Sequence, residues 1–297
     1  MAFSNLQALS NEFASLVEQV SKSVVRVDAR HRIAGTGVVW SADGIIVTAD
    51  HVVEREEGIE VLLPGGESVK AELVGRDPNT DVAALRVSAA GLAAADWTPP
   101  AELKAGHLAF AVGKPWDNTP IVSGGIISAV GIGIRGHGRN GFVQSYIVML
   151  PGFSGGPLVD ASARVIGMNS SVLGRGVSLA VPVETMKRVV ADLLKEGRVK
   201  RPYLGVGLQV VPLASSLSAK AGGQERALMI LTIESGGPAE QSGLLPGDIL
   251  LALGGHALQD IHDLQKALVP DKVGQSVKIT AVRGGELKEF SVKVGSK

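Results

Sequence analysis

The sequence contains no cysteine among its 297 residues, so it forms no disulfide bond and has no thiolate for catalysis or for binding zinc. It also has no excess of either charge, with 29 Lys plus Arg against 29 Asp plus Glu. Because no surplus of positive charge is available to neutralise phosphates, we expect neither a nucleic-acid partner nor an anionic-membrane partner.

Long apolar runs are missing as well. No stretch approaches the roughly 20 apolar residues of a membrane-spanning helix. The N-terminus lacks the basic region followed by an apolar segment that marks a signal peptide. As the sequence is written we expect a soluble cytoplasmic protein; the alternative is a periplasmic or other extracytoplasmic protein whose leader was removed.

Aromatic residues are few, at 4%, whereas 38 glycines separate many short runs rich in Val and Ile. This texture is typical of barrels and sandwiches. Six such runs lie within residues 23–87 and six more within 108–181. They predict a mainly β fold with two six-stranded antiparallel β-barrels, followed by a helix over residues 184–196.

Apolar residues at three- and four-residue spacing predict another helix, over residues 3–20. Its apolar stripe needs a partner. One interpretation packs the helix on its own domain, and the other packs it on a neighbouring subunit.

The segment 152–158 reads Gly-Phe-Ser-Gly-Gly-Pro-Leu. A serine between glycines can expose its hydroxyl on a sharp turn beside free backbone N–H groups, so Ser154 is a candidate nucleophile. The same letters fit the nucleophile elbow of α/β-hydrolases, which requires a helix directly after the serine. Here apolar runs flank a polar turn at residues 160–164 and predict a β-hairpin, which favours the barrel.

Two other residues supply the parts that an acyl-transfer serine needs. His51 follows the apolar run 45–48, and the other five histidines are interpreted as structural. Asp81 opens the apolar run 82–87, where a carboxylate is unusual unless a buried group receives it. The chain order His, Asp, Ser is that of chymotrypsin and differs from that of subtilisin and of α/β-hydrolases.

From about residue 18 to its C-terminus, the chain resembles an HtrA/Deg-type serine protease: a chymotrypsin-like protease domain followed by one PDZ domain. The resemblance rests on Gly35-Thr36-Gly37-Val38, Thr48-Ala49-Asp50-His51-Val52-Val53, Asp77 to Asp81, Ala111-Val112-Gly113-Lys114-Pro115, Ser123-Gly124-Gly125-Ile126-Ile127-Ser128 and Pro151 to Leu158. It implies that His51 is the general base, Asp81 its orienting carboxylate and Ser154 the nucleophile. The resemblance also implies that the backbone N–H groups of Gly152 and Ser154 form the oxyanion hole and that no metal or cofactor is required.

Three positions near the serine depart from the family pattern. Phe153 replaces the usual asparagine, Tyr146 an aspartate, and Met149-Leu150 an Ile-Asn pair. These positions bear on the specificity pocket and on how the oxyanion loop becomes active.

The C-terminal part resembles a PDZ domain of the HtrA type. We expect residues 1–22 to form an N-terminal helical segment, residues 23–198 the protease domain and residues 199–297 the PDZ domain. The resemblance implies a loop that captures a peptide's C-terminal carboxylate. Its residues are Tyr203, Leu204, Gly205 and Val206. Alternatively, Tyr203 fills the interface with the protease.

The function implied is that of an ATP-independent endopeptidase that cleaves unfolded or damaged polypeptides through an acyl-enzyme, in protein quality control and the stress response. Its expected partners are unfolded substrates, C-terminal peptides and further copies of the chain, as a trimer or multiples of it. One alternative is a weakly proteolytic holdase, because Phe153 could deform the oxyanion hole. Another is a regulatory protease that a specific C-terminal peptide activates.

Overall fold

The computed structural model describes residues 2–31, 33–133, 141–174 and 177–296, which form two compact units, Met1–Val199 and Lys200–Lys297. The elements of the first unit are α1 (Ala2–Ser21), β1 (Val24–Asp28), β2 (Gly35–Ser41), β3 (Ile45–Thr48), the short 3-10 helix η1 (Asp50–Val52), β4 (Ile59–Leu62), β5 (Ser68–Asp77), β6 (Val82–Val87), β7 (Leu108–Gly113), β8 (Ile121–Ile132), β9 (Phe142–Tyr146), β10 (Pro157–Asp160), β11 (Val165–Ser170), β12 (Ser178–Pro182) and α2 (Val183–Glu196).

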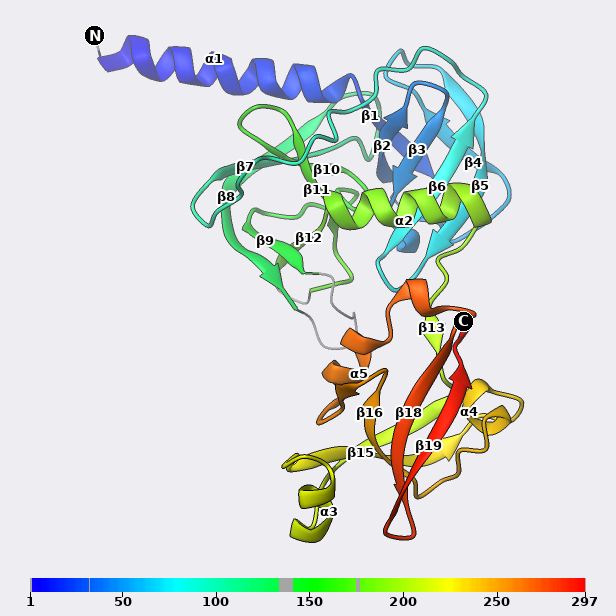
Figure 1. Ribbon diagram of the computed structural model, residues 1–297. Helices are drawn as coiled ribbons and strands as arrows, with labels where there is room; N and C mark the ends of the chain where they lie inside the picture. Colours follow the sequence, from blue (N-terminus) through cyan, green and yellow to red (C-terminus); the bar gives the residue numbers. More distant parts are fainter. Residues whose placement is uncertain (1, 32, 134–140, 175–176, 297) are drawn as a thin grey trace. The chain divides into compact units, whose positions relative to one another are not determined.

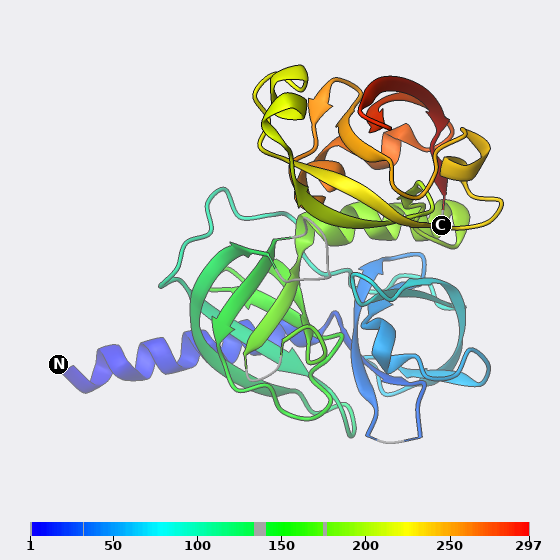
Figure 2. The ribbon, with the colours of Figure 1, turned by 90° about the horizontal axis from the view of Figure 1, so that it is seen from below.

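Twelve strands of this unit close into two barrels (Figures 1 and 2). The first has the strand order β1-β2-β3-β6-β5-β4, and the second has the equivalent order β7-β8-β9-β12-β11-β10. All pairings are antiparallel, and buried Val, Ile, Leu and Ala side chains fill the core. The predicted mainly β fold with two six-stranded antiparallel barrels is confirmed.

Helix α2 packs across strands of both barrels (Figure 1). Its buried face includes Met186, Val189 and Leu193, at helical spacing. Gly197 ends it in the left-handed conformation at φ +71°, with its N–H donating to the carbonyl of Leu193. The carbonyl oxygen of Gly197 lies so close to Gly75 that a Cβ there would come within 2.2 Å of it, so the helix end sits directly on β5.

Helix α1 has two different halves. In the second half, Phe13 packs on Phe110 of β7 with ring centroids 5.0 Å apart, and Leu16 and Val20 are buried in the barrel core. In the first half, Leu6 and Leu9 are 64% and 44% exposed. The helix therefore packs on its own domain through its C-terminal half and presents apolar side chains to solvent from its N-terminal half.

The second unit contains β13 (Pro202–Tyr203), β14 (Val206–Pro212), α3 (Ser215–Lys220), β15 (Arg226–Ile233), α4 (Pro238–Gln241), β16 (Ile249–Leu253), β17 (His256–Ala257), α5 (Ile261–Ala267), the 3-10 helix η2 (Pro270–Lys272), β18 (Ser276–Arg283), β19 (Glu286–Lys293) and β20 (Gly295–Ser296). Six strands form a sheet, with the order β14-β15-β16-β18-β19 and with β17 paired to β16 off this path, so β14 is an edge strand. Asp260 caps α5, and Asp263 completes a capping box with it.

Within the described parts of the chain, no helix has the length and apolar character needed to cross a bilayer.

Candidate active site

His51 and Asp81 meet where the first barrel faces the second. His51 lies in η1, directly after β3, and its Nδ1 is 2.9 Å from both carboxylate oxygens of Asp81. The backbone N–H of His51 donates to the same carboxylate at 3.0 Å, and so does the hydroxyl of Ser170 at 2.5 Å. Asp81 is 1% exposed. These donors compensate for the burial of its charge.

The backbone at Asp81 is held in an uncommon conformation, with φ at +58°. A residue with a Cβ adopts this region only at some cost in energy. The rest of the site therefore fixes Asp81 in place, which points its carboxylate at His51.

A partly buried ion pair between Arg76 and Asp50 anchors η1 from the neighbouring strand β5. The guanidinium of Arg76 donates to Asp50 Oδ1 at 2.5 Å and to the backbone carbonyl of Asp50 at 3.3 Å. The hydrogen bond to Asp50, and the carboxylate charges of Asp50, Glu56 and Asp81, raise the pKa of Arg76 above its ordinary value against the opposing effect of burial. Arg76 thus stays charged and holds the residue that precedes His51.

The serine loop lies between β9 and β10 and is tied to the first barrel through Thr36. The Thr36 hydroxyl donates to the carbonyl of Gly152 at 2.7 Å, and the Thr36 N–H donates to the carbonyl of Ser154 at 3.1 Å. Gly155 has φ at +86°, and a Cβ there would lie 2.1 Å from the Thr36 carbonyl oxygen. Only glycine permits this approach of the two barrels.

The backbone N–H groups of Gly152 and Ser154 are left open. Among the residues that the structure describes, neither donates to a protein acceptor, whereas the N–H groups of Phe153, Gly155 and Gly156 all do. Two unused donors beside an exposable hydroxyl fit a developing oxyanion.

The Ser154 hydroxyl reaches His51 through a second serine. Ser154 Oγ donates to Ser171 Oγ at 3.0 Å, and Ser171 Oγ lies 3.3 Å from His51 Nε2. The residues predicted from the sequence, His51, Asp81 and Ser154, are thus gathered in one place. Sequence reasoning missed Thr36, Ser170 and Ser171. The signal for the two serines was their position at and just after the end of β11, the second strand after the serine loop.

Known proteins similar to this chain include serine proteases. Residues 35–168 match the model of a trypsin-like peptidase domain, and residues 202–294 match that of a PDZ domain. The putative serine protease HhoB of Synechocystis sp. is 31% identical over 282 residues, covering 90% of this chain and 68% of that protein. The chain belongs to the HtrA/Deg family of serine proteases.

Two further similarities support this membership. A probable periplasmic serine endoprotease, DegP-like, of Ectopseudomonas mendocina is 35% identical over 271 residues, covering 88% of this chain but 56% of that protein. The chain thus spans little more than half the length of this DegP-like relative. Among solved structures, the HtrA-type protease AlgW with a decapeptide superposes with a TM-score of 0.81 at 27% identity, covering 96% of this chain and 98% of that one.

The names of the HtrA/Deg relatives correct one expectation. The DegP-like proteins that match this chain are named periplasmic. The expectation of a cytoplasmic location was wrong because it relied on the missing signal peptide, and a removed leader leaves no trace in the remaining sequence.

The positions that depart from the HtrA/Deg pattern lie in different environments. Phe153 is fully buried, and its ring packs on Gly113, where an added Cβ would lie 2.6 Å from it. Tyr146 and Leu150 instead are 83% and 39% exposed. Phe153 therefore belongs to the core of the second barrel, and Tyr146 and Leu150 belong to its surface.

The predicted PDZ loop combines strand and turn. Tyr203 in β13 pairs with Gly295 in β20, and its hydroxyl donates to Glu234. The carbonyls of Leu204 and Gly205 accept from the N–H groups of residues 239 and 234. The side chain of Leu204 is buried in the core, and Val206 begins the edge strand β14.

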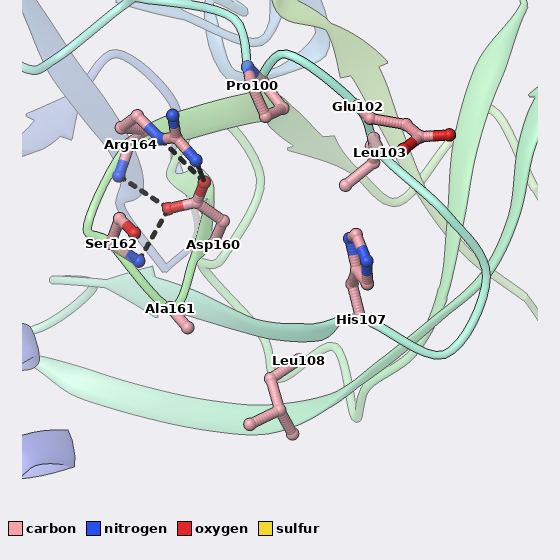
Figure 3. A pocket seen from close by; sticks show the side chains of 9 residues that line it. All are labelled: Pro100, Glu102, Leu103, His107, Leu108, Asp160, Ala161, Ser162 and Arg164. Atoms are coloured by element: carbon pink, nitrogen blue, oxygen red, sulfur yellow. Dashed lines mark hydrogen bonds and ion pairs between the residues drawn. The ribbon is translucent and has the colours of Figure 1, made fainter.

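A surface pocket at the far end of the hairpin lies apart from the predicted catalytic residues (Figure 3). Asp160 lies there at the end of β10, accepts from the N–H groups of Ser162 and Arg164, and pairs with the Arg164 guanidinium at 2.7 Å. His107 projects toward the same pocket. These contacts close the β10–β11 turn. Of the remaining histidines, His137 lies outside the described residues.

Within the described ranges, no group of three or more His, Asp or Glu side chains is placed to hold a metal ion.

Proposed function

We propose that this chain is an ATP-independent serine endopeptidase that hydrolyses unfolded or damaged polypeptides through an acyl-enzyme. The observation that carries the proposal is the junction of the two barrels, where the buried Asp81, His51 and the Ser154 hydroxyl lie beside two open N–H groups. This junction combines a nucleophile, a base, a carboxylate and an oxyanion site.

In the proposed reaction, Ser154 Oγ attacks the scissile carbonyl while His51 Nε2 takes its proton. Asp81 accepts a hydrogen bond from Nδ1, which fixes the tautomer and stabilises the imidazolium. The N–H groups of Gly152 and Ser154 hold the oxyanion. His51 then gives the proton to the leaving amine, and water cleaves the acyl-enzyme by the reverse sequence.

The alternative of a weakly proteolytic holdase chaperone is not favoured. That hypothesis depended on Phe153 deforming the oxyanion loop, yet the Phe153 ring is buried in the barrel core. Its N–H donates to the carbonyl of Leu150, and its carbonyl accepts from Gly156, so the loop is internally bonded around it. The neighbouring N–H groups of Gly152 and Ser154 remain open for an oxyanion.

We further propose that the PDZ domain binds C-terminal peptides. Among the residues that the structure describes, β14 pairs only with β15, so an extended peptide could add along its other side. Beside it, the N–H groups of Leu204 and Gly205 donate to no acceptor within the described residues. Together with Tyr203 and Val206 they would receive the terminal carboxylate. Two solved relatives are described as HtrA-type protease AlgW with a decapeptide and with a tripeptide.

Domain limits, assembly and location complete the proposal. The protease domain would cover residues 23–198, after the segment 1–22, and the PDZ domain residues 199–297; the two compact units support this division. The exposed Leu6 and Leu9 on α1 support a homo-oligomer, with a trimer as the proposed state. The names of the DegP-like relatives support a periplasmic location.

Digestion of an unfolded casein tests the endopeptidase function. The chain is incubated with casein, with and without a covalent inhibitor directed at serine nucleophiles. We expect peptide fragments that disappear when the inhibitor is present. Casein that stays intact but soluble would instead support a holdase, and fragments that persist with the inhibitor would exclude a serine nucleophile.

A further inference from the structure

Ser171 occupies the space between the predicted nucleophile and the predicted base. Its hydroxyl is 3.0 Å from Ser154 Oγ and 3.3 Å from His51 Nε2, and it follows directly after β11. Ser154 is 5% exposed, whereas Ser171 is an exposed residue. One exposed hydroxyl thus contacts both partners of the proposed proton transfer.

The direction of each hydrogen bond follows from the neighbours. The Asp81 carboxylate only accepts, so the proton of neutral His51 lies on Nδ1 and Nε2 is the acceptor. Ser171 therefore donates to Nε2, and Ser154 donates to Ser171. The lone pair of His51 Nε2, which must receive the Ser154 proton, therefore already accepts from Ser171. The Ser154 proton points at Ser171 Oγ and not at His51.

We propose that Ser171 is a positioning residue that holds Ser154 and His51 apart in the resting protein. This inference rests on the proposed endopeptidase function. Before reaction, the Ser171 hydroxyl rotates toward solvent, where water replaces its hydrogen bonds. Ser154 then donates directly to Nε2. Since Ser171 is exposed, its rotation costs no more than the net value of an ordinary hydrogen bond.

The opposite role, in which Ser171 relays the proton from Ser154 to His51, makes the opposite prediction. Removing the hydroxyl from a relay slows the reaction, whereas removing it from a resting contact accelerates the reaction. A single variant, Ser171→Ala, therefore separates the two.

The test uses diisopropyl fluorophosphate on the full chain, because this small reagent does not occupy a peptide groove. Ser154 Oγ forms a bond to phosphorus, fluoride leaves and His51 takes the proton. We expect Ser171→Ala to raise the second-order inactivation rate constant about two- to tenfold, the factor that corresponds to one neutral hydrogen bond. With a peptide substrate, kcat should rise and KM should stay constant.

Two matched variants control the test. Ser171→Thr keeps the hydroxyl and should react at the wild-type rate. Ser162→Ala removes an exposed hydroxyl from the turn after β10, at the other end of the hairpin, and should also react at the wild-type rate. An unchanged or lower rate constant in Ser171→Ala would overturn the proposal, and a lower one restored by threonine would indicate a relay.

Peptide mapping separates this failure from that of the proposed function. If the wild-type chain carries the phosphoryl adduct on Ser154 but Ser171→Ala reacts no faster, only the role of Ser171 is wrong. If Ser154 carries no adduct, the endopeptidase proposal fails, and the role of Ser171 fails with it.

Discussion

The Thr36 hydroxyl donates to the Gly152 carbonyl at 2.7 Å and accepts from the Lys114 N–H at 3.0 Å. Thr36 belongs to the first barrel, whereas Gly152 and Lys114 belong to the second. One side chain therefore fixes the oxyanion loop against the barrel that carries His51 and Asp81.

Replacing Thr36 by valine should lower both the stability of the fold and the catalytic rate. Valine keeps the shape but leaves the Gly152 carbonyl and the Lys114 N–H without their partner, which typically costs about 1–3 kcal/mol of stability per group. A shift of the loop should lower kcat by roughly 10- to 100-fold, since small displacements of catalytic groups are costly. Thermal unfolding and peptide hydrolysis measure the two effects. Thr36→Ser, which keeps the hydroxyl, should retain most activity; equal losses in both variants would mean that the hydrogen bonds of the hydroxyl do not position the loop.

Removing the Arg76 guanidinium should displace His51 indirectly, because Arg76 holds the preceding residue, Asp50. In Arg76→Gln the buried carboxylate of Asp50 loses its ion-pair partner, and we expect a loss of about 1–3 kcal/mol of stability together with a lower kcat. The double variant Arg76→Gln with Asp50→Asn removes the buried charge and should recover part of the stability. If the double variant is no more stable than the single one, the ion pair does not support η1.

The acid stability of the PDZ unit should depend on Asp248. Burial raises the pKa of the Asp248 carboxyl. Hydrogen bonds from Arg283 and from the Leu245 N–H, together with the charges of Arg283 and Lys288, lower this pKa by more than burial raises it. The pKa of Asp248 therefore lies below its ordinary value. Because its pKa is lower in the folded state, the Asp248 carboxylate stabilises the fold at pH values above its unfolded pKa of about 3.9. This stabilisation is lost as the pH falls through the lower pKa of the folded state.

Urea unfolding of residues 199–297, which contain their own hydrophobic core, measures this effect at pH 7 and at about pH 3. We expect Asp248→Asn to be less stable than the wild type at pH 7 and to lose less stability on acidification. A parallel loss in both proteins would show that another carboxylate controls the acid limb.

The PDZ unit should bind peptides through their C-terminal carboxylate. A peptide ending in valine should bind more tightly than its amidated form by roughly 1.5–3 kcal/mol, the range for hydrogen bonds to a charged group. A lysine-ended peptide should also bind weakly because its charge would lose hydration beside apolar side chains. Fluorescence titration on residues 199–297 compares the three. Equal affinities would mean that the N–H groups of Leu204 and Gly205 do not capture a carboxylate.

Much of the protein was predictable from sequence because its signals are local. Short Val/Ile runs and turn residues predicted both barrels, and Gly197 correctly marked the end of α2. His51, Asp81 and Ser154 stood out by their motifs. Thr36 and Ser171 did not, since a serine or threonine in or beside a strand is common and its contacts depend on how the barrels close. The division of α1 into a packed half and an exposed half also depends on tertiary contacts, because its apolar spacing is the same throughout.

The most direct test of the central claim is the proteolytic activity of Ser154→Ala. Its rate of casein cleavage is measured beside that of the wild type, with circular dichroism and PDZ peptide binding as controls for the fold. Removing a triad nucleophile typically lowers turnover on the order of a millionfold, whereas losing a hydroxyl changes stability little. We predict no detectable fragments from a folded variant that still binds peptide. Cleavage by folded Ser154→Ala at a rate comparable to the wild type would contradict the assignment of Ser154 as the nucleophile.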